Sequence, residues 1–246
     1  MESEVYLQLR NIEDTHWWFV ARRAIIGRIL NSMALPKDCN ILDFGCGTGG
    51  NLAMLKAFGE VVGLEMNQAA MNVARARNVC PVHWGVLPNI IPFQERQFDL
   101  VILLDVLEHV DDHLLALKSI EKILKPGGRV VITVPAFQFL WSEHDNRHHH
   151  KRRYTKRELA QTLLESGLKP IQVTYYNTFL FPLISAIRIA KNILSIRDTD
   201  DVMPVAWLNK ILYAIFVSER HLITHCTSLP FGVSLLAVVQ RSSIKD

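Results

Sequence analysis

Hydrophobic positions along the chain form short apolar runs that alternate with amphipathic segments. The apolar runs predict strands at 40–44, 60–65, 80–84, 98–104, 129–134, 170–176 and 233–240. The amphipathic segments predict helices near 17–33, 50–58, 67–77, 112–124 and 156–166. This alternation is typical of an α/β fold, with a mostly parallel sheet and helices on both of its faces.

Residues 177–231 interrupt the alternation. They are too many for a plain loop, so we expect two helices, near 179–196 and 205–227. The run that starts at Phe179 is apolar, but Arg188 and Lys191 interrupt it, and it is too short to cross a bilayer. Two interpretations stay open: a helical lid packed on the sheet, or an apolar acceptor site or membrane-surface contact with basic residues beside it.

The composition fits one enzyme domain. The chain has 246 residues, of which 49% are hydrophobic and 21% are charged. The first residues are acidic and no apolar signal segment follows, and Cys39, Cys46, Cys80 and Cys226 lack framework or metal-ligand spacing. We therefore expect a cytoplasmic protein with reduced thiols, with contact at the inner face of the membrane as an alternative.

A glycine-rich turn is the strongest local signal. The buried run 41–44 ends in Gly45, Gly47 and Gly50, and a helix-compatible segment follows. Glycines let the backbone approach a ligand, and the N–H groups at the start of the helix can bind an anionic group. The spacing also fits the dinucleotide pattern G-x-G-x-x-G, but Asp43 would repel a pyrophosphate and suits a cationic cofactor.

The run D-x-G-C-G-T-G at 43–49 resembles the first motif of class I S-adenosylmethionine-dependent methyltransferases. Later segments resemble that family's other motifs in order and spacing: the strand that ends at Glu65, the strand 98–104 with the segment 105–110, and Lys-Pro-Gly-Gly at 125–128. The resemblance covers about residues 40–135. It implies a seven-stranded Rossmann-like sheet with an antiparallel last strand and a helical insertion before it.

The resemblance implies a single methyltransferase domain over 1–246, which has four parts. The parts are an N-terminal cap helix at 1–35, a cofactor-binding core at 36–176, a helical lid at 177–231, and a last strand with a tail at 232–246.

S-Adenosylmethionine is the cofactor that the resemblance implies. Glu65 would accept hydrogen bonds from the ribose hydroxyls, and Met66 would face the adenine. The helix that carries the adjacent Trp17 and Trp18 either packs on the lid or closes over the cofactor, so that Arg22 pairs with the methionine carboxylate. The implied cofactor residues are Asp43, Gly45, Cys46, Gly47, Gly49, Glu65, Met66, Leu104, Asp105 and Arg22.

The stretch 147–157 is the candidate acceptor rim. Six of its eleven residues are Lys or Arg and three are His. The W-S-x-H-D pattern at 141–145, just before this stretch, and the H-x-x-R-R-Y-T pattern at 149–155 within it resemble bacterial methyltransferases of glycan and lipid-linked sugar assembly. We therefore expect O-methylation of an anionic or amphiphilic small molecule. An oxygen acceptor must lose a proton, and His109, His144 and His148 are the candidate bases.

Other interpretations stay open. The D-x-x-E-H segment at 105–109 is near the E-x-x-E-H of some metal-assisted methyltransferases, but we expect no metal, with Asp105 and Glu108 polarising cofactor contacts or capping a helix. An RNA methyltransferase would explain the basic rim, yet a net charge of +3 without an RNA-binding module predicts no nucleic-acid partner. A catalytically silent cofactor-binding protein and a nicotinamide-dependent dehydrogenase are the remaining alternatives, and the oligomeric state is open.

Overall fold

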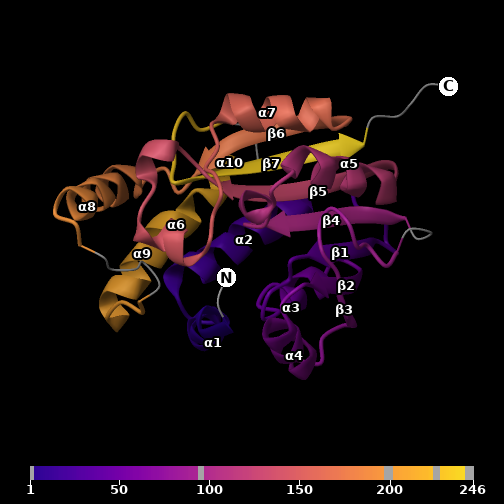
Figure 1. The fold of residues 1–246 in the computed structure, drawn as a ribbon, viewed down its shortest axis with the longest axis horizontal. Coiled ribbons are helices and arrows are strands. Elements are labelled where there is room, and N and C mark those ends of the chain that lie inside the picture. Colours follow the sequence, from indigo (N-terminus) through magenta and orange to yellow (C-terminus); the bar gives the residue numbers. More distant parts are fainter. Residues whose placement is uncertain (1–2, 94–96, 197–201, 224–227, 242–246) are drawn as a thin grey trace.

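The computed structural model describes residues 3–93, 97–196, 202–223 and 228–241. Seven strands form one sheet in the order β3-β2-β1-β4-β5-β7-β6 (Figure 1). Strand β7 pairs antiparallel with both neighbours, and the other pairings are parallel. The predicted sheet with an antiparallel last strand is confirmed. The strands are β1 (Asn40–Phe44), β2 (Glu60–Glu65), β3 (Val82–Trp84), β4 (Phe98–Leu104), β5 (Leu124–Pro135), β6 (Leu168–Tyr176) and β7 (Ser234–Arg241).

Helices alternate with the strands as predicted, and the described core adds two that were not expected, α1 at the start of the chain and the short α6 after β5. The added helix α1 spans Ser3–Ile12, and it precedes the expected cap helix α2, Trp17–Ser32. Strand β5 begins at Leu124 and so includes the Lys-Pro-Gly-Gly segment that was expected to precede it. The other helices of the core are α3 (Leu52–Lys56), α4 (Gln68–Ala76), α5 (His113–Ile123), α6 (Glu143–Arg147) and α7 (Lys156–Glu165).

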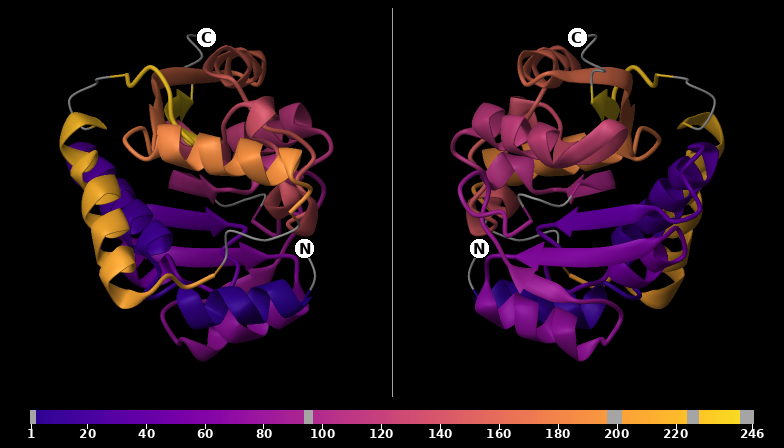
Figure 2. Two further views of the ribbon diagram at one scale, coloured as in Figure 1. Left: turned by 90° about the vertical axis from the view of Figure 1, so that its left-hand side faces the viewer. Right: turned by 90° about the vertical axis from the view of Figure 1, so that its right-hand side faces the viewer.

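The centre of the sheet is buried on both faces. In β4, Leu100 to Leu103 are fully buried, because α2 lies on one side of the sheet and α5 on the other (Figure 2). Burial on both faces explains why residues 100–104 of β4 are a continuous apolar run without polar alternation. The same arrangement brings the carboxyl ends of β1, β2, β4 and β5 to one edge.

The segment 177–231 forms three helices in its described part, where two were expected. They are α8 (Phe181–Ile193), α9 (Ala206–Ser218) and the short α10 (Arg220–Ile223). Residues 224–227, the end of the second expected helix, lie outside the described residues. Helix α9 packs along α2, while α8 lies at the far end of the molecule (Figures 1 and 2). Within the described residues, no helix has the length and apolar character needed to cross a membrane.

The two adjacent tryptophans explain how α9 is held against α2. The Trp18 ring stacks on Phe216 of α9 with centroids 5.2 Å apart, and Trp17 meets the same ring edge-on at 5.9 Å. Asn209 of α9 also accepts a hydrogen bond from the Trp17 backbone N–H at 2.8 Å. Packing against the insertion is therefore one role of this pair. Both side chains also line the cavity described below, and closure of this helix over the cofactor stays a prediction.

Candidate active site

A cavity of about 880 Å³ opens at the carboxyl ends of β1, β2, β4 and β5. Its volume is in the range of small-molecule sites in proteins. One part is lined by the glycine turn and the ends of β2 and β4, and another by the histidine-rich segment 144–150. Helices α8 and α9 add an apolar wall of Leu183, Ile184, Ile187, Leu208 and Leu212.

The glycine turn brings backbone to the cavity without side chains in the way. Gly45 and Gly47 have φ of +75° and +56°, a region that favours glycine. A Cβ atom on Gly45 would lie 2.6 Å from a methyl carbon of Val106, so this position excludes a larger residue. At Gly47 nothing lies within 4 Å of the Cβ position, which leaves room for a ligand against the backbone.

Asp43 lies at the end of β1 and is 1% exposed. Its Oδ2 has no hydrogen-bond partner within the described residues. Burial raises the pKa of Asp43 to about 7; the charge of Glu65 adds to this shift and that of Arg22 opposes it. A buried carboxylate with an unsatisfied oxygen favours a nearby cation. Unlike the glycine turn, Asp43 does not line the cavity.

Glu65 ends β2 and joins it to the glycine turn. Its Oε2 accepts a hydrogen bond from the Gly47 N–H and its Oε1 from the Asn67 N–H, both at 2.8 Å. Burial raises the pKa of Glu65 although these hydrogen bonds lower it. Each carboxylate oxygen keeps a lone pair, so Glu65 can still accept hydrogen bonds from a ligand's hydroxyl groups.

Arg22 and Asp105 form an ion pair between α2 and the end of β4. Asp105 has a φ of +57°, and Thr133 of β5 donates a hydrogen bond to its Oδ1 at 2.9 Å. The Arg22 side chain is buried, and its Nε has no hydrogen-bond partner in the described part of the chain. Arg22 therefore brings a positive charge to the cavity, of which Asp105 offsets a part.

The remaining expected cofactor residues divide into two groups. Cys46, Met66 and Leu104 line the cavity. Gly49 does not, because it packs against α4, where a Cβ would lie 3.2 Å from the Cα of Ala74. Its φ of +84° serves the turn itself.

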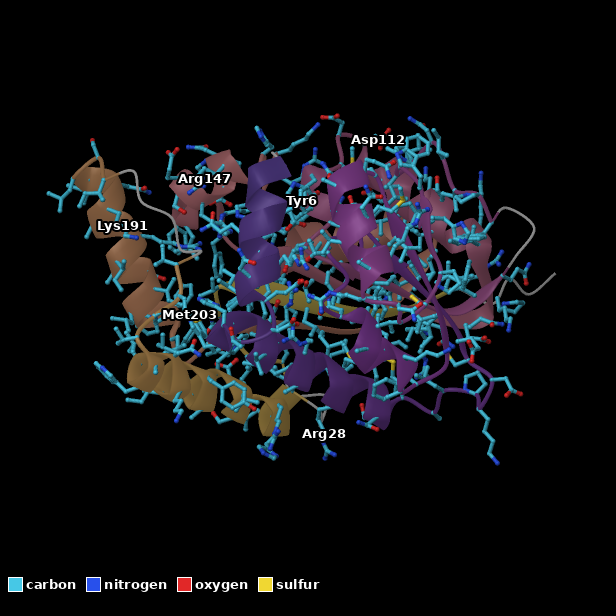
Figure 3. All side chains as sticks on the ribbon, turned by 90° about the horizontal axis from the view of Figure 1, so that it is seen from below. Tyr6, Arg28, Asp112, Arg147, Lys191 and Met203 are labelled. Carbon is cyan, nitrogen blue, oxygen red and sulfur yellow. The ribbon has the colours of Figure 1, made fainter. Side chains whose placement is uncertain are left out.

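Helix α1 and the turn after it complete the site, and the sequence analysis missed them. Tyr6 and Leu9 line the cavity (Figure 3 shows Tyr6 on α1). Burial, with the charge of Glu65 next, raises the pKa of Tyr6. Glu13 accepts a hydrogen bond from the Thr48 hydroxyl at 2.6 Å and so anchors the glycine turn. The spacing of Tyr6, Leu9 and Ile12, three residues apart, is the helical signal that could have identified this segment.

Histidines form the opposite wall, and the structure brings the three expected ones together there with His150. The rings of His144 and His148 stack with centroids 4.1 Å apart, and those of His109 and His150 meet at 4.8 Å. Burial lowers the pKa of His109 to about 3, with the neighbouring His150 and His148 acting in the same direction. Glu108 lies behind them and is fully buried; burial and then the charge of Asp105 raise its pKa well above the ordinary value.

Asp145 holds this wall in place. It accepts hydrogen bonds from Arg153 Nε and Nη2 at 2.9 Å each, and its Oδ1 is 2.8 Å from His150 Nδ1. Burial alone would raise the pKa of Asp145, but the hydrogen bonds from His150 and Arg153 and the Arg153 charge hold it well below its ordinary value. Arg153 is thus a buried structural cation, although the sequence placed it in the basic rim.

Only part of the expected basic rim reaches the cavity. Lys151 and Arg153 line it, and the other Lys and Arg residues of 147–157 are absent from its lining. Arg152 donates to the backbone carbonyl of Asp111 at 2.8 Å, and Lys151 pairs with the Asp111 side chain. Arg188 and Lys191 of α8 line the cavity instead, and they come from the insertion (Figure 3 labels Lys191).

Residues 18–173, more than half of the chain, match the family model described as a methyltransferase domain. The chain belongs to the methyltransferase domain family. Demethylmenaquinone methyltransferase from Staphylococcus aureus is 32% identical to this methyltransferase over 155 residues, which are 57% of this chain and 62% of that protein. The match thus spans less than two thirds of that relative's length.

Solved structures share the fold of this methyltransferase. An S-adenosylmethionine-dependent methyltransferase from Mesorhizobium loti has a TM-score of 0.58 at 17% identity, covering 93% of this chain and all of that one. Magnesium protoporphyrin IX methyltransferase from Synechocystis, solved with bound S-adenosylhomocysteine, has a TM-score of 0.54 at 13% identity, covering 91% of this chain and 85% of that one.

S-Adenosylmethionine is the methyl donor of this family, and the site fits it. The open side of Gly47 leaves room for the ligand, and the unsatisfied Oδ2 of Asp43 favours a cationic group nearby. Glu65 has lone pairs left for hydroxyl groups.

Proposed function

We propose that this methyltransferase transfers a methyl group from S-adenosylmethionine to an oxygen atom of an anionic or amphiphilic small molecule, such as a glycan or lipid-linked intermediate. The observation that carries the proposal is one cavity with three kinds of lining. It combines the glycine turn with Glu65, a wall of histidines, and an apolar wall with basic residues.

On the cofactor side, Gly45, Cys46 and Gly47 would hold the methionine moiety, with its amino group near the Asp43 charge. Arg22 would pair with the methionine carboxylate through the edge that Asp105 leaves open. Glu65 would accept the ribose hydroxyls, with Met66 beside the adenine and Leu104 and Asp105 on the far side of the pocket. The sulfonium supplies the activated methyl group, and the protein aligns the acceptor with it.

On the acceptor side, apolar and basic groups share one wall. Leu183 and Ile187 of α8 line the cavity, and Arg188 and Lys191 of the same helix line it too. Lys151 adds a third basic side chain from the segment after β5. An acceptor with an apolar part and an anionic group would satisfy both kinds of contact.

A histidine would take the proton of the acceptor hydroxyl. His109 stays neutral when buried, and a base with a pKa of about 3 holds a proton too weakly at neutral pH. We therefore assign proton acceptance to the stacked pair His144 and His148, which line the same cavity. His109 keeps a role in shaping the wall.

A second candidate function, contact with a membrane surface, is favoured by the exposed apolar residues of the insertion. Ile193 is 76% exposed, Leu194 66% and Trp207 65%. Exposed apolar side chains in such number, with Lys191 beside them, are typical of helices that lie in the interface of a membrane. A lipid-linked acceptor would reach the cavity from that surface.

Methyl transfer from radiolabelled S-adenosylmethionine into a lysate of the source cells tests the proposal. After extraction into lipid, nucleic-acid, protein and water-soluble fractions, we expect label in the lipid or soluble-sugar fraction. The Glu65→Ala variant serves as the control that lacks a cofactor contact. Label in RNA would overturn the proposed acceptor class. Cofactor binding without label in any fraction would favour a silent binding protein.

A further inference from the structure

We propose that Glu108, His109 and His150 bind one divalent transition-metal ion in the wall of the cavity. Each of the three offers a ligand atom, and these atoms lie within 4.8 Å of one another. All three residues line the cavity. The ion would be reached from the acceptor side, and its binding does not depend on the presence of cofactor.

Glu108 is the first observation that points to a cation. Its side chain is fully buried, and neither carboxylate oxygen has a hydrogen-bond partner within the described residues. On the histidine wall, His150 Nε2 lies 4.0 Å from Glu108 Oε1. Burying a charged carboxylate without a partner costs on the order of several kcal/mol. A metal ion between Glu108 and the histidines would supply the missing partner.

The second observation is that the structure prepares His150 as a ligand. Its Nδ1 is 2.8 Å from Asp145 Oδ1, and Asp145 is held in turn by Arg153 and by the Ser142 N–H at 2.9 Å. A proton on Nδ1, donated to Asp145, leaves the lone pair on Nε2, the atom that faces Glu108. A carboxylate behind a histidine in this way is the usual outer contact of metal-bound imidazoles.

His109 is fixed in a similar way. A hydrogen bond to the backbone of His149 engages the ring, and the ring packs edge-on against that of His150. Since a neutral imidazole has one donor and one acceptor nitrogen, donation to the backbone leaves one nitrogen for a metal. Both histidines can therefore act as neutral ligands beside the Glu108 carboxylate.

The separations are close to those of a bound ion. Bonds of about 2.0–2.2 Å in a tetrahedral site put two ligand atoms about 3.4 Å apart. The 4.0 Å between Glu108 Oε1 and His150 Nε2 needs only a small side-chain movement to reach that value. Two histidines and a carboxylate leave a coordination position open, as in catalytic zinc sites and in facial-triad iron sites.

The open position would face the acceptor. His144 and His148 also have ligand atoms within 4.8 Å of a nitrogen of His150, so they flank the site. An ion here would coordinate the acceptor oxygen and lower the pKa of its hydroxyl group. That role rests on the proposed O-methylation, whereas metal binding itself can be measured on the protein alone.

Calorimetric titration of the full-length, untagged, chelator-stripped protein with Zn²⁺, and separately with Mn²⁺, tests the site. We expect one ion of at least one of these metals per chain. The isosteric Glu108→Gln variant should bind it more weakly by about 10–100-fold or more, since loss of an outer contact alone has that effect. His83→Ala, on exposed β3 and away from the cavity, is the matched control and should bind like the unmodified protein.

Thermal unfolding without metal separates ligand loss from misfolding. Because Glu108→Gln removes a buried, unpartnered carboxylate, its metal-free midpoint should equal or exceed that of the unmodified protein. Added Zn²⁺ should raise the midpoint of the unmodified protein and leave that of the variant almost unchanged. The proposed site is wrong if the unmodified protein binds neither ion, or if Glu108→Gln binds the ion with the same affinity as the unmodified protein. Loss of binding only in His144→Asn or His148→Asn would also overturn this ligand set.

Discussion

Arg22 of α2 pairs with Asp105 at the end of β4, so helix α2 is tied to the sheet at the cofactor side of the cavity. Thr133 of β5 holds the other oxygen of Asp105 through a 2.9 Å hydrogen bond. Three elements that are far apart in the sequence thus meet at one charged pair. The pair leaves the buried Arg22 Nε without a hydrogen-bond partner in the described part of the chain. Because Arg22 lines the cavity, we expect its guanidinium to bind a ligand carboxylate.

Replacement of Arg22 by Gln should weaken binding of S-adenosylhomocysteine by about 1.5–3 kcal/mol, the range for a lost hydrogen bond to a charged group. The measurement is isothermal titration calorimetry. Arg28→Gln is the matched control, because Arg28 lies on the same helix but is exposed (Figure 3). Equal affinity of Arg22→Gln and the unmodified protein would show that this guanidinium does not hold the methionine carboxylate.

Glu65→Ala should weaken binding of the same ligand by about 1.5–3 kcal/mol, because the ribose hydroxyls lose a charged acceptor. Glu60→Ala, at the exposed start of the same strand, should leave the affinity unchanged. Loss of Glu65 also frees the N–H groups of Gly47 and Asn67, so the unfolding temperature should fall. If the temperature falls while the affinity stays the same, Glu65 supports the turn without contacting the ribose.

The fold could be predicted from the sequence because local patterns determine it. The strand β1, its glycine turn and the strand β4 each carry a periodicity and a composition that few other structures share. Their alternation with helices predicted a mostly parallel sheet, and the antiparallel β7 followed from the resemblance. The helical spacing of Tyr6, Leu9 and Ile12 is visible in the sequence of α1, but the place of this segment at the cavity depends on the hydrogen bond between Glu13 and Thr48, which are 35 residues apart.

The candidate site was less predictable, since side-chain direction depends on tertiary contacts. Arg153 and Lys151 are two positions apart in a basic run, but Arg153 turns inward to a buried pair with Asp145 while Lys151 is exposed. Gly49 belongs to the motif yet packs on α4. The segment 105–109 could be compared with a metal-binding motif in the sequence, but the approach of His150 to Glu108 and His109 needs the segment after β5 to fold back over the end of β4.

Asp43 should make both stability and cofactor binding depend on pH. Its pKa rises from 3.8 to about 7 on folding, so between these values the folded chain binds more protons than the unfolded chain. The stability of the cofactor-free protein should therefore fall as pH rises from about 4 to about 7, by an amount on the order of 1–4 kcal/mol. A cationic ligand group favours the ionised carboxylate, so affinity should rise over the upper part of this window.

Asp43→Asn tests this assignment. The variant should lose this part of the pH dependence of its unfolding free energy, be more stable without cofactor near pH 7.5, and bind S-adenosylhomocysteine more weakly. Denaturant unfolding and calorimetry at several pH values measure the two effects. Asp38→Asn, in the exposed turn before β1, is the control. Unchanged pH profiles in Asp43→Asn would mean that this carboxylate does not titrate in the window.

The exposed apolar residues at the end of α8 should decide whether the protein binds membranes. After sedimentation with anionic phospholipid vesicles, the unmodified protein should be in the vesicle pellet. The double variant Ile193→Asp, Leu194→Asp should stay in the supernatant. Each large apolar side chain that enters the interface contributes up to about 1.5–3 kcal/mol, so the loss should be tenfold or more. Higher salt should also weaken binding, because Lys191 lies on the same helix. Leu164→Asp on α7 is the matched control, since Leu164 is 61% exposed but lies on a different helix. If both variants sediment with vesicles to the same extent, the exposed surface of α8 does not contact the membrane, and the acceptor must reach the cavity from water.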